Sequence, residues 1–385
     1  MGGCLSSDSD VPKSKPQPAP QPSSNQQAAS GKGATKFAVP TGAPTKKINI
    51  TPKRAVGVSN SADEDAFKIC IVGAGESGKT TFTRNMVLNY LGGINDKDRR
   101  SEIVTIRGNM IDAIKDLIKF VQSEGLESEL PDDEEEFIQN LLDVDAFDAD
   151  FSELAAGLHK IWNCDVIQKA YYHTSQVVVP DNMDYFFEKY LEIAKEDYVP
   201  TDGDLLRVRV RTIGIKPMVF DLEGARFQLT DVGGQICERK NWQKVLEGTE
   251  AVIFAFSLAE FDRKMFEKPE ELRIDDSIKL FEATVNGETC SECPIYLVGN
   301  KYEKFCKKIQ ETDAFGAAFP DFQGNIHDPL ATSEYLFKLF KDKMVQNGSE
   351  YHTFQTFTMT AIDSQSVIKV AESVFEDLNR RFFCD

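Results

Sequence analysis

Residues Gly73 to Thr80 have the types and spacing needed to hold a phosphate group. They read GAGESGKT and match the pattern G-x-x-x-x-G-K-[ST] in full. Glycines let the backbone turn its N–H groups inward around an anion, at a helix N-terminus whose dipole favours negative charge. Lys79 would reach the outer phosphates, and the Thr80 hydroxyl would bind Mg²⁺. The stretch predicts a nucleoside triphosphate site rather than a glycine-rich turn without a ligand.

The residues on either side supply the elements that this pattern requires. Phe67–Val72 is an apolar run typical of a buried strand, and Thr81–Leu91 has the composition of a helix. A strand that leads through the loop into a helix is the setting in which the pattern binds phosphate.

A second group of reactive side chains follows much later. Asp231-Val232-Gly233-Gly234-Gln235 lies at the end of a predicted strand. An Asp there can hold a Mg²⁺-bound water, the Gly234 N–H can approach a γ-phosphate, and Gln235 can orient an attacking water.

Basic residues precede this group in the run Arg207-Val208-Arg209-Val210-Arg211-Thr212. The spacing suits one Arg to developing phosphate charge and Thr212 to Mg²⁺. A basic run alone is usually a solvated surface, but beside the two glycine motifs it indicates catalysis. Asn300-Lys301-Tyr302-Glu303 directly follows another predicted strand, where a base-recognition loop belongs.

Hydrophobic patterns predict an α/β fold. Besides Phe67–Val72, strands are predicted at Met218–Leu222, Arg226–Thr230, Ala251–Ser257, Pro294–Val298 and Phe354–Met359. Helices are predicted between and after them, at Lys240–Leu246, Glu270–Val285, Ser333–Met344 and Ser364–Arg381. In the long stretch between the first predicted helix and the second predicted strand, helices are predicted at Arg99–Val121, Phe151–Trp162, Val166–Tyr172 and Asp184–Ala194. A short helix is also predicted in the acidic stretch Glu124–Asp150. The chain therefore reads as a mostly parallel six-stranded sheet with helices on both faces, interrupted by an all-helical inserted domain.

The predicted domain boundaries follow from these patterns. Residues 1–62 are a Pro-rich tail without apolar periodicity, which predicts disorder. Residues 63–91 and 205–385 form the two parts of the sheet domain, and residues 92–204 form the helical insertion.

The tail carries signals for a membrane surface. Its start, MGGCLS, fits the N-myristoylation pattern at Gly2, and Cys4 is placed for a second acyl chain. Eight Lys and Arg against two Asp give the tail a net charge of +6, which favours an anionic leaflet. The alternative is a solvated linker with an unmodified Gly2. The whole chain has a net charge of −18, which argues against nucleic acid as a partner.

Together these motifs resemble the heterotrimeric G-protein alpha subunits, from about Phe67 to Phe375. The phosphate loop matches the family's G-A-G-E-S-G-K-[ST], and Leu206–Ile215 matches its first switch, L-R-x-R-x-x-T-x-G-I. The second switch, D-V-G-G-Q, is intact, and the residues ERKNW at 238–242 match the family's E-R-K-x-W. The resemblance implies a P-loop GTPase (Ras-like) domain that the helical domain interrupts.

The resemblance also assigns roles by position. Arg209 is implied to be a built-in arginine finger and Gln235 to align water, while Thr80 and Thr212 bind Mg²⁺ and Asp231 acts on it through water. The nucleotide-binding residues that it implies are Gly75, Glu76, Ser77, Gly78, Lys79, Thr80, Thr81, Asp181, Asn182, Leu206, Arg207, Val208, Arg209, Thr212, Asp231, Gly234, Asn300, Lys301, Glu303 and Ala361.

The sequence departs from the family in several places. Glu303 replaces the Asp of N-K-x-D and places the same bidentate acceptor one methylene further out. We expect selectivity for GTP to be retained, and either unchanged or weakened, because discrimination between bases depends on placement. The T-C-A-T loop reads Met359-Thr360-Ala361-Ile362, which keeps the Ala361 N–H for the guanine carbonyl. Ile236 replaces the Arg after the switch glutamine. The N-terminal helix is not visible in residues 8–62, and the C-terminal helix is about four residues short.

The function implied is a signalling switch at the cytoplasmic face of the plasma membrane, with a cytosolic pool. GTP would order the two switches, and hydrolysis to GDP and phosphate would release them. The implied partners are a beta-gamma dimer, a receptor or exchange factor, RGS-type GTPase activators and an effector. A nucleotide-stabilised, non-catalytic scaffold is the alternative. A phosphate-loop kinase or ATPase agrees poorly with D-V-G-G-Q and N-K-x-E, and a small GTPase of the ADP-ribosylation-factor type lacks the helical insertion.

Overall fold

The computed structural model describes residues 66–173, 177, 179–212, 215–222, 225–240, 242–265, 268, 270–290, 292–345 and 353–382. The predicted tail, with Gly2 and Cys4, lies outside the described residues. None of the helices among the described residues is long and apolar enough to cross a membrane.

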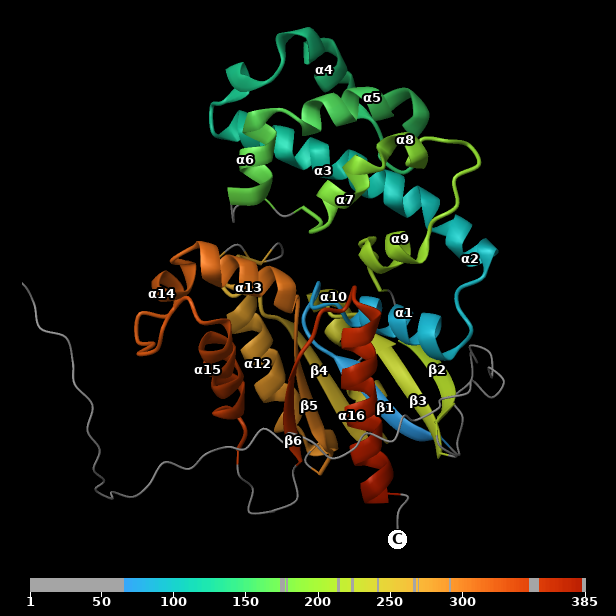
Figure 1. The fold of residues 1–385 in the computed structure, drawn as a ribbon, viewed down its shortest axis with the longest axis vertical. Coiled ribbons are helices and arrows are strands. Elements are labelled where there is room, and N and C mark those ends of the chain that lie inside the picture. Colours follow the sequence, from blue (N-terminus) through green and yellow to red (C-terminus); the bar gives the residue numbers. More distant parts are fainter. Residues whose placement is uncertain are drawn as a thin grey trace, which may run out of the picture. The chain divides into compact units, whose positions relative to one another are not determined.

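One six-stranded sheet organises the part of the chain that contains the phosphate loop (Figure 1). Its order is β2-β3-β1-β4-β5-β6, with β2 antiparallel to β3 and the other neighbours parallel. The strands are β1 (Phe67–Val72), β2 (Ile215–Leu222), β3 (Ala225–Val232), β4 (Ala251–Ser257), β5 (Ile295–Asn300) and β6 (Phe354–Thr358). Since β1, β3 and β5 run in the same direction, the loops after their carboxyl ends meet at one edge. The three predicted motifs therefore converge there.

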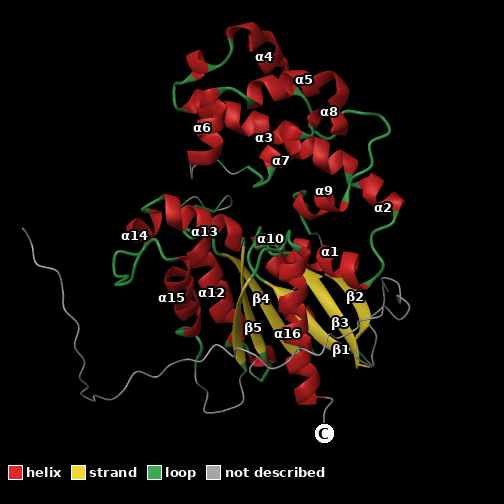
Figure 2. Ribbon diagram, in the orientation of Figure 1, coloured by secondary structure: helices red, strands yellow, loops and turns green. Residues whose placement is uncertain are grey.

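Helices cover both faces of the sheet (Figure 2). On one face α1 (Lys79–Tyr90) and α16 (Ser364–Phe382) pack on a core that includes Phe82, Phe227 and Val374. On the other face lies a second core that includes Phe254, Phe281 and Phe340. The helices on that side are α11 (Trp242–Leu246), α12 (Arg273–Val285), α13 (Tyr302–Glu311), α14 (Ala314–Ala318) and α15 (Pro329–Lys341). The short helix α10 (Ile236–Arg239) follows Gln235.

Between α1 and β2 the described residues form helices and no strand. These are α2 (Asp96–Ser101), α3 (Ile103–Ser123), α4 (Glu135–Asp143), α5 (Phe151–Trp162), α6 (Asp165–His173), α7 (Met183–Glu188), α8 (Tyr190–Ile193) and α9 (Asp202–Arg207). They enclose a hydrophobic core of their own. Its centre is α3, because residues such as Ile106, Met110 and Ile114 recur at helical spacing and are fully buried.

Several predicted elements differ from the observed ones. The single helix predicted at Asp184–Ala194 is two helices that meet at Lys189. A helix was predicted at Lys240–Leu246, and the observed helix in this segment, α11, begins at Trp242. The base-recognition segment is not a loop, since α13 begins at Tyr302 and Glu303 lies in its first turn. Helix α9 was not predicted, and it spans the expected domain boundary between residues 204 and 205.

Candidate functional site

The phosphate loop depends on glycine at two positions. A Cβ on Gly73 would lie 1.9 Å from the Ala255 carbonyl oxygen, and one on Gly78 would lie 1.9 Å from Asn300 Nδ2. Both glycines have positive φ angles, of 145° and 91°. The loop therefore packs closely against β4 and the end of β5.

Lys79 is buried at the centre of this loop. Its ammonium donates hydrogen bonds to the carbonyl oxygens of Gly73 at 2.9 Å and Ala74 at 2.8 Å. Burial lowers the pKa of Lys79 to about 8, although the Asp231 carboxylate acts in the opposite direction. If a phosphate binds here, the Lys79 ammonium would exchange its hydrogen bonds to these carbonyl oxygens for hydrogen bonds to phosphate oxygens.

Three oxygen-bearing side chains meet beside Lys79. The Thr80 hydroxyl forms a short hydrogen bond with the Thr212 hydroxyl and donates to Asp231 Oδ2 at 2.9 Å. The other carboxylate oxygen, Asp231 Oδ1, is buried and has no hydrogen-bond partner among the described residues. Burial also raises the pKa of Asp231, with Lys79 opposing the effect. Clustered hydroxyl and carboxylate oxygens with one unsatisfied acceptor fit a hard cation such as Mg²⁺, which prefers oxygen ligands.

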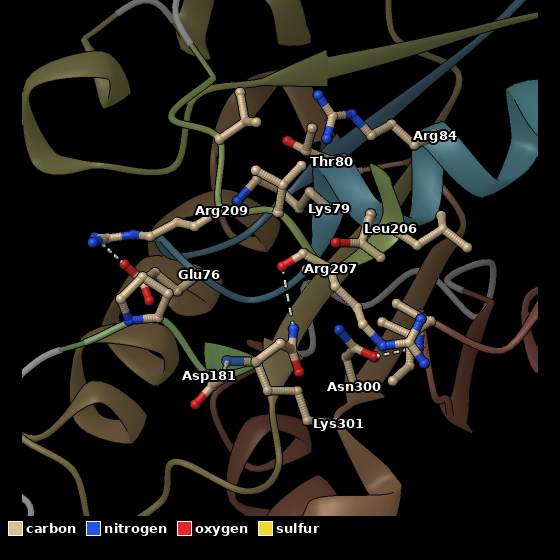
Figure 3. A pocket seen from close by; sticks show the side chains of 18 of the residues that line it. Glu76, Lys79, Thr80, Arg84, Asp181, Leu206, Arg207, Arg209, Asn300 and Lys301 are labelled. Atoms are coloured by element: carbon tan, nitrogen blue, oxygen red, sulfur yellow. Dashed lines mark hydrogen bonds and ion pairs between the residues drawn. The ribbon is translucent and has the colours of Figure 1, made fainter. Parts of the chain in front are cut away.

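Arg209 reaches the pocket from the segment after α9 (Figure 3). The helix is anchored by Asp204, a fully buried carboxylate. The donors to Asp204 are the side chains of Tyr185, Lys189, Tyr198 and Thr201 and the Thr201 N–H. The Arg209 guanidinium forms an ion pair with Glu76, and the Arg209 carbonyl accepts a hydrogen bond from Asn109 at 2.8 Å.

Switch residues 233–239 lie against the same loop. A Cβ on Gly234 would lie 2.4 Å from Lys79 Nζ and 2.4 Å from the Gly73 carbonyl oxygen, so only glycine allows this approach. Arg239 donates to the Gly234 carbonyl oxygen at 3.0 Å and pairs with both Asp276 oxygens, at 2.7 and 2.6 Å. Gln235 follows Gly234 and lines the pocket.

The predicted base-recognition residues are held together by hydrogen bonds. Asn300 donates from Nδ2 to the Ser77 carbonyl oxygen at 2.9 Å, and its Oδ1 accepts the Ala361 N–H at 2.9 Å. The amide predicted to meet the guanine carbonyl therefore already bonds Asn300. Lys301 forms an ion pair with Asp181, which comes from the helical segment.

The positive charges around Asp181 stabilise its contact with Lys301. Burial alone would raise the pKa of Asp181, but Lys301, Lys304 and Arg263 keep it well below its usual range. Lys304 also donates to the Asp181 carbonyl oxygen at 2.6 Å and to Asn182 Oδ1 at 3.2 Å.

One pocket brings nearly all of the predicted residues together. Those that line it are Gly75, Glu76, Gly78, Lys79, Thr80, Thr81, Asp181, Asn182, Leu206, Arg207, Val208, Arg209, Thr212, Gly234, Gln235, Asn300, Lys301, Glu303 and Ala361. Ser77 and Asp231 do not line this pocket. Ser77 borders a smaller neighbouring pocket, and Asp231 accepts a hydrogen bond from the Thr80 hydroxyl. Arg84 and Lys304 also line the main pocket but were not predicted. Arg84 lies four residues after Thr80 on the same face of α1, and Lys304 lies in the first turn of α13, three residues after Lys301; this spacing was the available signal.

Comparison with known proteins points to one family. A sequence model of the G-protein alpha subunit matches residues 45–378, beginning inside the predicted tail. Guanine nucleotide-binding protein subunit alpha-1 of Trichomonas vaginalis is 40% identical over 334 residues, covering 86% of this chain and 82% of that protein. The alpha-2 subunit of Schizosaccharomyces pombe is 27% identical over 341 residues, covering 87% and 94%. The alpha-8 subunit of Dictyostelium discoideum is 29% identical over 319 residues, covering 82% and 78%.

With a family match over most of its length and the two switch motifs gathered around one phosphate loop, the chain belongs to the G-protein alpha subunit family, whose members are GTPases.

Proposed function

We propose that this chain is a membrane-tethered switch that binds GTP or GDP with Mg²⁺ and hydrolyses GTP to GDP and phosphate. Arg209 would act as a built-in arginine finger, and Gln235 would align the attacking water. The helical segment from α2 to α9 would be an inserted domain that covers the nucleotide. The observation that carries the proposal is the convergence of Thr80, Thr212 and Asp231 beside Lys79.

The chemistry follows from these positions. Water attacks the γ-phosphorus while the bond from that phosphorus to the β–γ bridging oxygen breaks, which leaves GDP and phosphate. Gln235 orients the water by hydrogen bonds, and Lys79 donates to the outer phosphate oxygens. Arg209 donates to the oxygens on which negative charge develops. Mg²⁺, held by Thr80, Thr212 and, through water, Asp231, would neutralise phosphate charge when bound.

Single-turnover hydrolysis of GTP tests these roles. In Gln235→Leu and Arg209→Cys, Mg²⁺-dependent nucleotide affinity should remain and phosphate release should nearly stop, because each variant removes a group that acts only in the transition state. Normal hydrolysis in either variant would remove the assigned role. If the unaltered chain binds GTP without hydrolysing it, the non-catalytic scaffold is the better description.

The membrane tether rests on sequence alone. Gly2 and Cys4 would carry acyl chains, and the basic tail would add attraction to anionic lipid at the cytoplasmic face of the plasma membrane. Incorporation of labelled myristate, followed by sedimentation with phosphatidylserine vesicles, tests this, with Gly2→Ala as the unacylated control.

Family membership also supports a beta-gamma dimer, a receptor or exchange factor and RGS-type activators as partners. Proteins that the GDP-loaded chain retains, compared with the GTPγS-loaded chain, would identify which of these bind and would reveal the effector.

A further inference from the structure

Two residues that depart from the family pattern contact each other at the base end of the pocket. Glu303 lies in the first turn of α13, and Thr360 lies between β6 and α16. The Thr360 hydroxyl donates a hydrogen bond to Glu303 Oε2 at 2.9 Å. Glu303 lines the nucleotide pocket together with Ala361, the neighbour of Thr360.

The backbone on each side of this contact is fixed independently of it. The Thr360 N–H donates to Ser366 Oγ at 2.9 Å, which ties the residue to the first turn of α16. The Tyr302 N–H donates to the Met359 carbonyl oxygen at 3.1 Å, which joins the start of α13 to the end of β6. The hydroxyl is therefore presented to Glu303 by a rigid frame.

We propose that Thr360 is a positioning residue, which holds the Glu303 carboxylate in place for the N1–H and the 2-amino group of guanine. These two donors lie side by side on the base, and an ionised carboxylate can accept both. The hydroxyl occupies only one of the roughly four acceptor positions of the carboxylate, so enough remain for the base. The inference rests on the proposed binding of guanine nucleotides.

The additional methylene of glutamate explains why such a group is needed. Glu has one more rotatable side-chain bond than Asp, so an unrestrained Glu carboxylate must lose more freedom when it binds the base. Glu303 is exposed and forms no ion pair with any described residue, so no salt bridge within the described part of the chain orients it. The hydrogen bond from Thr360 supplies that restraint before the nucleotide arrives.

Competition binding of GDP and inosine diphosphate (IDP) to the full chain tests this, since hypoxanthine keeps N1–H but lacks the 2-amino group. Thr360→Val removes the hydroxyl at nearly constant shape, and Thr360→Ser keeps it. We expect Thr360→Val to weaken GDP binding about five- to tenfold, which corresponds to the loss of one ordinary hydrogen bond of about 1 kcal/mol at an exposed site. IDP should be affected less, so the preference for GDP should fall. Thr360→Ser should bind GDP and IDP with the affinities of the unaltered chain.

Glu303→Ala provides the second arm. If Thr360 acts through the carboxylate, Thr360→Val should have no further effect on GDP binding in a Glu303→Ala background. The inference is overturned if Thr360→Val binds as the unaltered chain does, if it weakens GDP and IDP equally, or if its effect persists without Glu303. If the unaltered chain binds neither nucleotide, the proposed function fails and the inference fails with it.

Discussion

The guanidinium of Arg209 forms an ion pair with the carboxylate of Glu76, so the proposed arginine finger contacts the phosphate loop directly (Figure 3). Arg273 lies 3.6 Å from the other Glu76 oxygen and also pairs with Glu260. In the proposed mechanism, Arg209 would have to turn away from Glu76 before it could stabilise developing phosphate charge. The pairing would then compete with catalysis.

Glu76→Gln tests this competition. The pair is partly exposed, with side-chain exposures of 37% for Arg209 and 19% for Glu76. Such pairs contribute at most about 1 kcal/mol, so freeing Arg209 should accelerate single-turnover hydrolysis by no more than about fivefold. The variant Glu129→Gln, on the exposed surface of the helical segment, is a matched control. A large loss of activity in Glu76→Gln would mean that the pair positions Arg209 rather than restraining it.

Gly234→Ala should weaken GTP binding more than GDP binding. The new Cβ would collide with Lys79 Nζ and the Gly73 carbonyl oxygen. Overpacking of this kind costs about 1–3 kcal/mol, so the affinity for GTP should fall about fivefold or more. Competition between GTP and GDP measures the change. Gly316→Ala is the control, because its Cβ would meet only Ile326, at 3.3 Å. Equal weakening of both nucleotides would contradict a role in γ-phosphate contact.

Much of this site could be predicted from the sequence because it is built from contiguous motifs. The glycines, Lys79 and Asp231 occur at fixed spacings, and apolar runs marked the strands that carry them. The strand Ala251–Ser257 and the helix Phe151–Trp162 were predicted with the observed bounds.

Pairings between distant residues could not be predicted in this way. Arg84 pairs with Glu102 and donates to the Leu205 carbonyl oxygen at 2.8 Å, although 121 residues separate Arg84 from Leu205. Helix α9 has only six residues and is stabilised by contacts with Asp204 rather than by its own periodicity. No local pattern marks either feature.

Arg84→Met should accelerate GDP release. Arg84 joins α1 to Glu102, before α3, and to α9, so it connects the two chain segments that enter and leave the helical segment. Losing hydrogen bonds of a charged group costs about 1.5 kcal/mol or more, so release should be roughly tenfold faster. Stopped-flow release of a fluorescent GDP analogue measures this rate. An unchanged rate would show that Arg84 does not limit exchange.

Arg99→Met is a matched variant for this experiment. Arg99 pairs with Asp202 and donates to the Pro200 carbonyl oxygen at 3.1 Å, so it joins the same two segments further from the pocket. We expect a smaller effect, because the Asp202 side chain is 60% exposed.

Asp377 should make the stability of the sheet part depend on acid pH. This buried carboxylate of α16 accepts hydrogen bonds from Tyr296 of β5 at 2.9 Å, from Arg381 at 2.7 Å and from Arg380 at 2.6 Å. Burial alone would raise the pKa of Asp377, but these hydrogen bonds lower it below its ordinary value. The stabilisation is therefore complete above the unfolded pKa of about 3.9 and is lost as the pH falls through the lower folded pKa.

Urea unfolding of Asp377→Ala at pH 7 and at pH 3 tests the prediction. At pH 7 the variant should be less stable by about 1–3 kcal/mol, because the Tyr296 hydroxyl is left buried without a partner. At pH 3 the difference should shrink. The double variant Tyr296→Phe/Asp377→Leu removes both polar groups and should recover part of the loss. A difference independent of pH would show that the ionised carboxylate contributes nothing.

The attachment of Asp204 has a consequence for the timing of the reaction cycle. Its five hydrogen bonds all come from the helical segment, yet it precedes Arg209 by five residues and Thr212 by eight. In the proposed cycle, an outward movement of that segment on nucleotide entry would draw the upstream end of the first switch with it. Enclosure of the nucleotide and assembly of the hydrolytic groups would then be a single event, and GTP that is only half enclosed would be protected from premature cleavage.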